Sequence, residues 1–146
     1  MKHALRKAFP STLPVLAGYV FLGIAYGITM RENGFGAAWS LLISAAVYAG
    51  SMQFALIGLL TGSFAPVTTA LMTLLVNARH IFYGLSMLEH YKKVRRKPYL
   101  IFALTDETYS LVSQTQHRET GYCFWVTLLD HCYWVLGTLL GGLVGT

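Results

Sequence analysis

The sequence has 146 residues, of which 55% are hydrophobic and only 12% are charged. Ordinary soluble domains contain about 45–50% hydrophobic and about 25% charged residues, so this composition excludes a typical soluble domain and indicates a membrane protein. The net charge of +5 does not indicate nucleic-acid binding, because most of the excess lies in two clusters beside apolar segments, where basic residues orient a protein in its membrane and contact anionic lipid. These clusters are Lys2, Arg6, Lys7 and Lys92, Lys93, Arg95, Arg96, Lys97.

The first apolar segment, 12–30, is predicted to be a transmembrane helix. It is longer than the core of a secretory signal and no small-x-small cleavage site follows it closely, so we expect it to be retained. Gly23 and Gly27 are four positions apart. This spacing of small residues lets a neighbouring helix approach closely.

The second segment, 36–62, contains no charged residue and as one straight helix would be about 40 Å long, more than the roughly 30 Å of hydrocarbon. Gly50 and Ser51 at its centre offer a break point. Two full crossings after the first helix would put the basic clusters on opposite sides of the membrane, against the positive-inside rule. We therefore predict that this segment enters and leaves by the same face, with its turn near Gly50 and Ser51.

Three further membrane segments follow, of which the middle one is interrupted by an acidic pair and is too short and too charged to face lipid. They are predicted at 66–88, 99–115 and 122–145, with a basic loop at 89–98. The predicted fold is therefore all-α: a polytopic helical membrane protein with about four to five membrane segments, at least one of them broken or re-entrant. Residues 1–146 form a single transmembrane domain in this interpretation.

Arg79 lies in the middle of an apolar segment, where a charge costs at least a few kcal/mol unless it is paired or reaches water. The expected partner is one of three carboxylates: Asp106, Glu107 or Asp130. Such a pair could simply fix how helices pack. Two histidines, His80 and His131, add to the ionisable groups in this small bundle, and their number favours an ion or substrate pathway.

Three motifs, in this order along the chain, resemble the AzlC family. They are Ala-Gly-Ser-Met-Gln-Phe at 49–54, Leu-Val-Asn-Ala-Arg-His-Ile-Phe-Tyr-Gly at 75–84 and Leu-Thr-Asp-Glu-Thr at 104–108. The similarity runs from the first helix to the end of the chain. Members of this family are the large subunits of two-component branched-chain amino acid exporters, and they usually continue with further apolar helices, so this chain looks C-terminally short.

The resemblance implies a multi-pass protein of the cell (inner) membrane that exports valine and related apolar amino acids together with a small membrane subunit of the AzlD type. A zwitterionic substrate needs donors for its carboxylate and acceptors for its ammonium group. The expected substrate-binding residues are Gly50, Ser51, Gln53, Asn77, Arg79, His80, Asp106 and Glu107. Three of them, His80, Asp106 and Glu107, are also the candidates for proton coupling. The expected side-chain pocket consists of Met52, Phe54, Met72 and Phe82.

Two other functions remain open from the residues alone. An intramembrane enzyme such as a hydrolase is disfavoured, because the G-x-S-x-G and H-E-x-x-H motifs are missing. Cys123 and Cys132 lie on opposite sides of one helix and match no zinc spacing, so we predict neither a disulfide between them nor a metal site. We also predict no cofactor and no catalytic residues. The second alternative is a non-transporting or truncated membrane scaffold or partner subunit. The interactions of such a protein would remain intact in Arg79→Ala.

Overall fold

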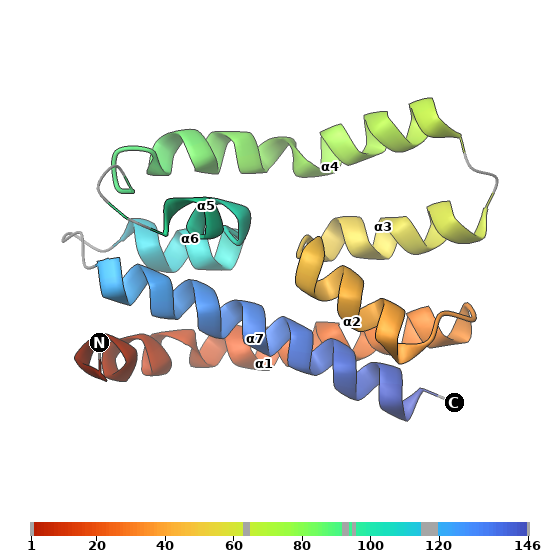
Figure 1. The fold of residues 1–146 in the computed structure, drawn as a ribbon, viewed down its shortest axis with the longest axis horizontal. Helices are drawn as coiled ribbons and strands as arrows, with labels where there is room; N and C mark the ends of the chain where they lie inside the picture. The colour runs from red at the N-terminus through yellow and green to blue at the C-terminus, as the bar shows by residue number, and fades with distance from the viewer. Residues whose placement is uncertain (1, 63–64, 92–93, 95, 115–119, 146) are drawn as a thin grey trace.

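The computed structural model describes residues 2–62, 65–91, 94, 96–114 and 120–145. Within these ranges the chain forms seven α-helices and no β-strand, which confirms the all-α prediction (Figure 1). The helices are α1 (Lys2–Glu32), α2 (Ala37–Ala46), α3 (Gly50–Thr61), α4 (Pro66–Met87), α5 (Lys97–Phe102), α6 (Asp106–Ser113) and α7 (Thr120–Val144).

Helices α1 and α7 form the long pair of the molecule and run side by side in the same direction (Figure 1). Their 31 and 25 residues correspond to about 46 and 37 Å, enough to cross roughly 30 Å of hydrocarbon. Both are apolar over a membrane-spanning length, with mean hydropathy of 1.7 and 1.3. Helix α1 extends beyond the predicted membrane segment 12–30 at both ends. Ala8 in its early turns is buried in one hydrophobic cluster with Met87 and Tyr91.

Glycines bring the backbones of α1 and α7 into contact, as the spacing of Gly23 and Gly27 predicts. A Cβ atom at Gly27 would lie 2.5 Å from the backbone nitrogen of Gly142, and one at Gly137 would lie 2.7 Å from the carbonyl oxygen of Val20. Side chains larger than hydrogen therefore do not fit in this interface. The two cysteines of α7 are free, with Cys123 buried and Cys132 exposed.

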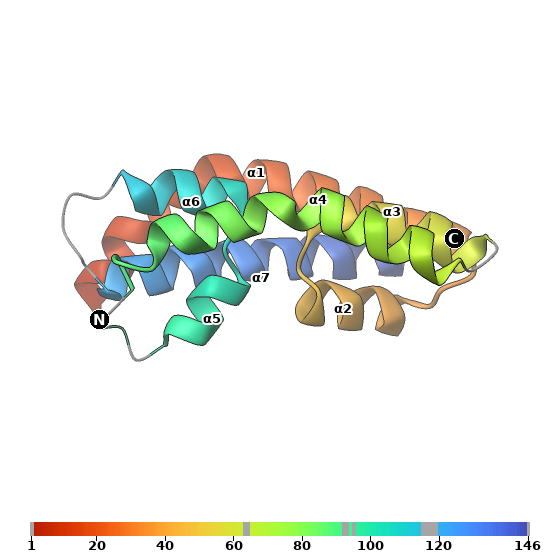
Figure 2. The ribbon, with the colours of Figure 1, turned by 90° about the horizontal axis from the view of Figure 1, so that it is seen from above.

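The second apolar segment is broken, as predicted, into α2 and α3. Helix α2 runs inward from the end of α1, the chain reverses at 47–49, and α3 runs outward to the same end of the molecule (Figures 1 and 2). This reversal lies immediately before Gly50 and Ser51, near which the turn was predicted. Tyr48 has the left-handed conformation, with φ 44°, which is strained for a bulky side chain. Gly50 is instead the first residue of α3, where a Cβ atom would lie 3.0 Å from the ring of Trp134.

Helices α5 and α6 form a second hairpin, which enters from the opposite end of the molecule (Figure 1). Its chain reverses at 103–105, within the predicted segment 99–115, of which residue 115 lies outside the described residues. The helices of the two hairpins contain 6 to 12 residues, or about 9–18 Å, which is too short to cross roughly 30 Å of hydrocarbon. Both hairpins end near the middle of the molecule's long axis, beside α4, which runs back between the two ends of the molecule (Figure 1).

The starts of α1 and α5 lie at the same end of the molecule (Figure 1). Lys2, Arg6 and Lys7 of the first basic cluster lie in the first turns of α1. Of the second cluster, Arg96 directly precedes α5 and Lys97 is its first residue, whereas Lys92, Lys93 and Arg95 lie outside the described residues. The described basic residues of both clusters therefore lie at one end of the molecule, where the positive-inside rule would put a single cytoplasmic face.

The glycine interface makes a stability prediction. We expect Gly27→Ala to lower the free energy of unfolding by about 1–3 kcal/mol, because overpacking pushes two backbones apart. The matched control is Gly18→Ala on the same helix, where a Cβ atom would meet nothing within 4 Å. The measurement is the thermal unfolding midpoint of each purified variant in detergent, and equal midpoints for the two variants would contradict the close contact.

Candidate functional site

A cavity of about 290 Å³ lies between the tips of the two hairpins. This volume is at the lower end of the roughly 300–1,000 Å³ that is typical of small-molecule sites. It is lined by residues of α1, α4, α7 and both hairpin tips: Tyr19, Leu22, Tyr48, Ala49, Gly50, Ser51, Phe54, Arg79, His80, Thr105, Asp106, Glu107 and Trp134. Because both tips end near the middle of the molecule's long axis, the cavity lies there as well (Figure 1).

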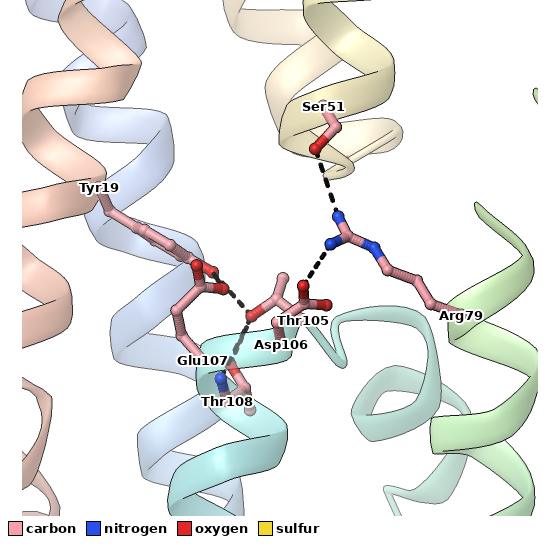
Figure 3. A network of polar contacts seen from close by, with 7 residues as sticks. All are labelled: Tyr19, Ser51, Arg79, Thr105, Asp106, Glu107 and Thr108. Atoms are coloured by element: carbon pink, nitrogen blue, oxygen red, sulfur yellow. Dashed lines mark hydrogen bonds and ion pairs between the residues drawn. The ribbon is translucent and has the colours of Figure 1, made fainter. Parts of the chain in front are cut away.

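Arg79 forms an ion pair with Asp106, one of the three carboxylates predicted as its partner (Figure 3). Its second terminal nitrogen donates a hydrogen bond to Ser51 Oγ at 3.3 Å. One guanidinium from α4 therefore joins the first turn of α3 to the first turn of α6. The two side chains are 41% and 38% exposed, so this pair belongs to the cavity wall rather than to a sealed core.

The two helix N-termini at the cavity differ in charge. Helix α6 begins with Asp106 and Glu107, and the hydroxyl of Thr105 caps it by accepting a hydrogen bond from the Thr108 backbone N–H at 3.3 Å. Helix α3 begins after Ala49, which offers no capping side chain, so the N–H groups of its first turn remain open. The α3 end therefore attracts an anion, whereas the α6 end already carries two carboxylates.

A chain of hydroxyl groups leads from the cavity into the protein. The Tyr19 hydroxyl lies 2.6 Å from Glu107 Oε2 and 2.7 Å from Thr105 Oγ1 (Figure 3). Thr105 Oγ1 lies 3.0 Å from Thr108 Oγ1, which lies 2.8 Å from Asp130 Oδ2. Sequence reasoning missed Tyr19, Thr105 and Thr108. A threonine just before an acidic pair is a recognisable helix cap, but Tyr19 is 86 positions away from Thr105 and no local pattern joins them.

Two of the predicted binding residues do not line the cavity. Gln53 is fully buried; its amide donates to Ser44 Oγ at 2.9 Å and accepts from Trp134 Nε1 at 2.8 Å. It therefore joins α2, α3 and α7 through both ends of its amide. Asn77 donates to the Thr73 carbonyl oxygen at 3.0 Å, on the outer part of α4.

The histidines have different surroundings. His80 lines the cavity, and its Nδ1 atom is buried with no hydrogen-bond partner among the described residues. His131 stacks on Tyr48 with ring centroids 4.2 Å apart and shares a 3.1 Å hydrogen bond with the Tyr99 hydroxyl. It therefore supports the strained residue at the first hairpin tip.

The described residues hold no group of three His, Cys, Asp or Glu side chains that could bind a metal ion.

Of the four residues expected to form a side-chain pocket, only Phe54 lines the cavity. Met52 is buried, whereas Met72 and Phe82 are exposed on α4. The apolar wall consists instead of Leu22, Phe54 and Trp134.

Comparisons with known proteins identify the family of the chain. The sequence profile of a family described as "AzlC protein" matches residues 14–146. The "Branched-chain amino acid transport protein AzlC" of Bacillus subtilis is 45% identical over 98% of this chain and 58% of its own length. An "Uncharacterized membrane protein" of Haemophilus influenzae is 44% identical over 99% of this chain and 62% of its own length. The "Inner membrane protein YgaZ" of Escherichia coli is 25% identical over 92% and 58%.

The chain thus spans about three fifths of the length of these relatives. No solved structure matches it.

The ion pair predicts a measurable coupling. Arg79→Gln and Asp106→Asn should each lower the unfolding midpoint in detergent, because each leaves one charge unpaired beside the cavity, and the double variant should recover part of the loss. For this partly exposed pair we expect a coupling free energy of about 1 kcal/mol, between that of surface and buried pairs. The control combines Arg79→Gln with Glu107→Gln. Their effects on the free energy of unfolding should be additive, because Arg79 and Glu107 form no ion pair with each other. Additivity in the Asp106 cycle would contradict the pairing.

Proposed function

Because the chain belongs to the AzlC family, we propose that it forms the site through which branched-chain amino acids such as valine cross the membrane. The named Bacillus subtilis relative is a transport protein for branched-chain amino acids. The observation that carries the proposal is the cavity between the two hairpin tips, where opposite charges lie on opposite walls. Discontinuous helices that meet near the middle of the bilayer are a common way to build such a site in transporters.

The substrate carboxylate binds at the first turn of α3. Open N–H groups at Gly50 and Ser51 provide donors and a favourable helix dipole. Arg79 adds a positive charge beside them, since its guanidinium already reaches Ser51. Asp106 neutralises part of this charge, so that the empty site does not hold an isolated cation in the membrane.

The substrate ammonium group binds Glu107. This carboxylate lines the cavity and forms no ion pair among the described residues, in contrast to Asp106. The branched side chain then contacts Leu22, Phe54 and Trp134. A pocket of this kind distinguishes one methylene by only about 1–3 kcal/mol, so several apolar amino acids should be accepted.

Export is the direction that we propose, coupled to protons through the ionisable groups of the cavity, His80, Asp106 and Glu107. We also propose that the chain is a multi-pass protein of the cell inner membrane and works with an AzlD-type small subunit. Membrane-protein relatives, one of them named an inner membrane protein, support the location. The broad apolar exposure of α4, with Val67 and Leu75 72% and 77% exposed, supports contact with lipid or another membrane subunit.

The first functional prediction concerns Arg79. Cells that express the chain, preloaded with labelled valine, should export it, and Arg79→Ala should reduce the rate at least about tenfold, because charge-assisted hydrogen bonds contribute about 1.5–3 kcal/mol. The control is Arg6→Ala, an exposed arginine near the N-terminus. All proteins are compared at equal membrane abundance, with and without an AzlD-type subunit. Unchanged efflux in Arg79→Ala would contradict the site, and no efflux from any inserted protein would favour a non-transporting membrane component.

The second prediction concerns the zwitterion. Unlabelled valine, leucine and methionine should compete with labelled valine at concentrations within about tenfold of one another. Isobutylamine lacks the carboxylate of valine and 3-methylbutanoate lacks its amine, so each leaves one charged wall unpaired and should compete poorly. The measurement is the half-inhibitory concentration of each compound. Inhibition by isobutylamine as strong as that by valine would show that the positive wall does not bind the substrate carboxylate. Equally strong inhibition by 3-methylbutanoate would show that the negative wall does not bind the ammonium group.

A further inference from the structure

We propose that the carboxyl groups of Glu107 and Asp130 exchange a proton through a chain of three hydroxyl groups. The hydroxyls belong to Tyr19, Thr105 and Thr108 (Figure 3). The inference rests on the proposed transport function, because it identifies the path of the coupled proton. It also gives a role to Asp130, which the sequence suggested only as a partner for Arg79.

The series of hydrogen-bonded groups from Glu107 to Asp130 contains one hydrogen more than its three hydroxyl groups can supply. Four contacts of 2.6, 2.7, 3.0 and 2.8 Å join the five groups in series, from Glu107 to Asp130. Four hydrogen bonds in series need four hydrogens, and three hydroxyls supply three of them. The tyrosine hydroxyl makes this plain, because its single hydrogen cannot be donated to both Glu107 and Thr105. The fourth hydrogen must come from a carboxyl group, so the complete chain holds one proton on one of its two acids.

The surroundings of Asp130 favour such a shared proton. Its side chain is fully buried, and its Oδ1 atom has no hydrogen-bond partner among the described residues. The ionisable groups that face it are Tyr19 of α1, Tyr48 at the first hairpin tip and Glu107 of α6, and none of them is a cation. Its neighbour on α7, His131, is directed to Tyr48 and Tyr99 instead. A carboxylate buried without a cation is costly, and a proton can remove that charge.

The same five groups can form two hydrogen-bonded series that differ only in the direction of donation. In one, Glu107 donates to Tyr19, each hydroxyl donates to the next, and Asp130 accepts as a carboxylate. In the other, Asp130 donates to Thr108 and every bond is reversed, so that Glu107 is the carboxylate. Conversion breaks one O–H bond and forms one at each step, and moves one proton without any other reactant. The transfers themselves reverse all four hydrogen bonds, so the second arrangement is complete without rotation of any hydroxyl group.

This exchange connects the proton to the substrate. Glu107 is exposed in the cavity, where it can take a proton from water. When the proton lies on Asp130, Glu107 is anionic and can bind the substrate ammonium group. When the proton returns, Glu107 is neutral and its attraction for the ammonium group is lost. Proton and substrate therefore alternate at one carboxylate.

The same bonds also join α1, α6 and α7, so the test must separate coupling from packing. Thr108→Val removes one hydroxyl from the middle of the chain and keeps the shape of the side chain. Thr108→Ser restores the hydroxyl. The matched control is Thr127→Val on α7, where the residue is equally buried and its hydroxyl has no partner among the described residues.

The experiment measures valine transport in proteoliposomes in two ways. Exchange of labelled for unlabelled valine at equal pH needs binding but no net proton movement, whereas uptake driven by a pH gradient needs both. Thr108→Val and Asp130→Asn should reduce gradient-driven uptake at least about tenfold and retain exchange, while Thr108→Ser and Thr127→Val should retain both. Gradient-driven uptake that persists in Thr108→Val, or equal losses of both activities in Thr108→Val and Thr127→Val, would overturn the proposal.

A spectroscopic measurement tests the proton path even if valine is not the substrate. Infrared spectra of the protein in lipid should contain the C=O stretching band of a protonated carboxyl group, and Asp130→Asn should remove or shift it. If the band behaves in this way and wild-type protein moves no valine, the transport function is wrong and the shared proton stands. If no such band exists, or Asp130→Asn leaves it unchanged, the proton path is wrong whatever the transport result.

Discussion

Hydrocarbon solvates neither a charge nor an open backbone group, and this constraint accounts for the centre of the molecule. Two stretches of irregular backbone, 47–49 and 103–105, lie near the middle of the molecule's long axis. Such backbone is tolerated inside a membrane only where protein or a water-filled cavity surrounds it. Arg79 and Asp106 lie where the two stretches meet, and the guanidinium also reaches Ser51. The pair therefore compensates its own charges and holds together the two hairpin tips that line the cavity.

The contacts divide the structure into a tight part and a looser part. Helices α1 and α7 touch through their backbones at Gly27 and Gly137, where no side chain fits. The hairpins contact this pair through side chains: Gln53 accepts a hydrogen bond from Trp134, and Leu100 and Val112 share a buried hydrophobic cluster with Val126. Side-chain contacts can be exchanged with only small movements, whereas a backbone contact between glycines cannot be repacked. The hairpins and α4 are therefore the elements that can move without disturbing the glycine contacts, as in transporters that rock one bundle against another.

The parts of the fold that follow from local physics could be predicted from the sequence. Length and apolarity predicted the all-α fold and the break in the second apolar segment. The cost of a lone charge required a partner for Arg79, which is Asp106. The exact first turn was missed because Tyr48, not a glycine, has the left-handed conformation, supported by stacking on His131 from α7. The series of hydroxyl groups was missed because its members lie on helices far apart in sequence. Only tertiary packing brings Tyr19 to the cap of α6.

The difference between the two hairpin tips bears on what the cavity can select. Two uncapped helix N-termini facing one cavity would favour a dianion, because both dipoles and Arg79 would attract negative charge. Here only α3 is uncapped, while α6 is capped by Thr105 and carries Asp106 and Glu107 in its first turn. Asp106 is used by Arg79, so Glu107 is left as the negative wall opposite a positive one. A ligand with one carboxylate and one ammonium group satisfies both walls, and a simple acid or amine leaves one of them unpaired at a depth where this is expensive.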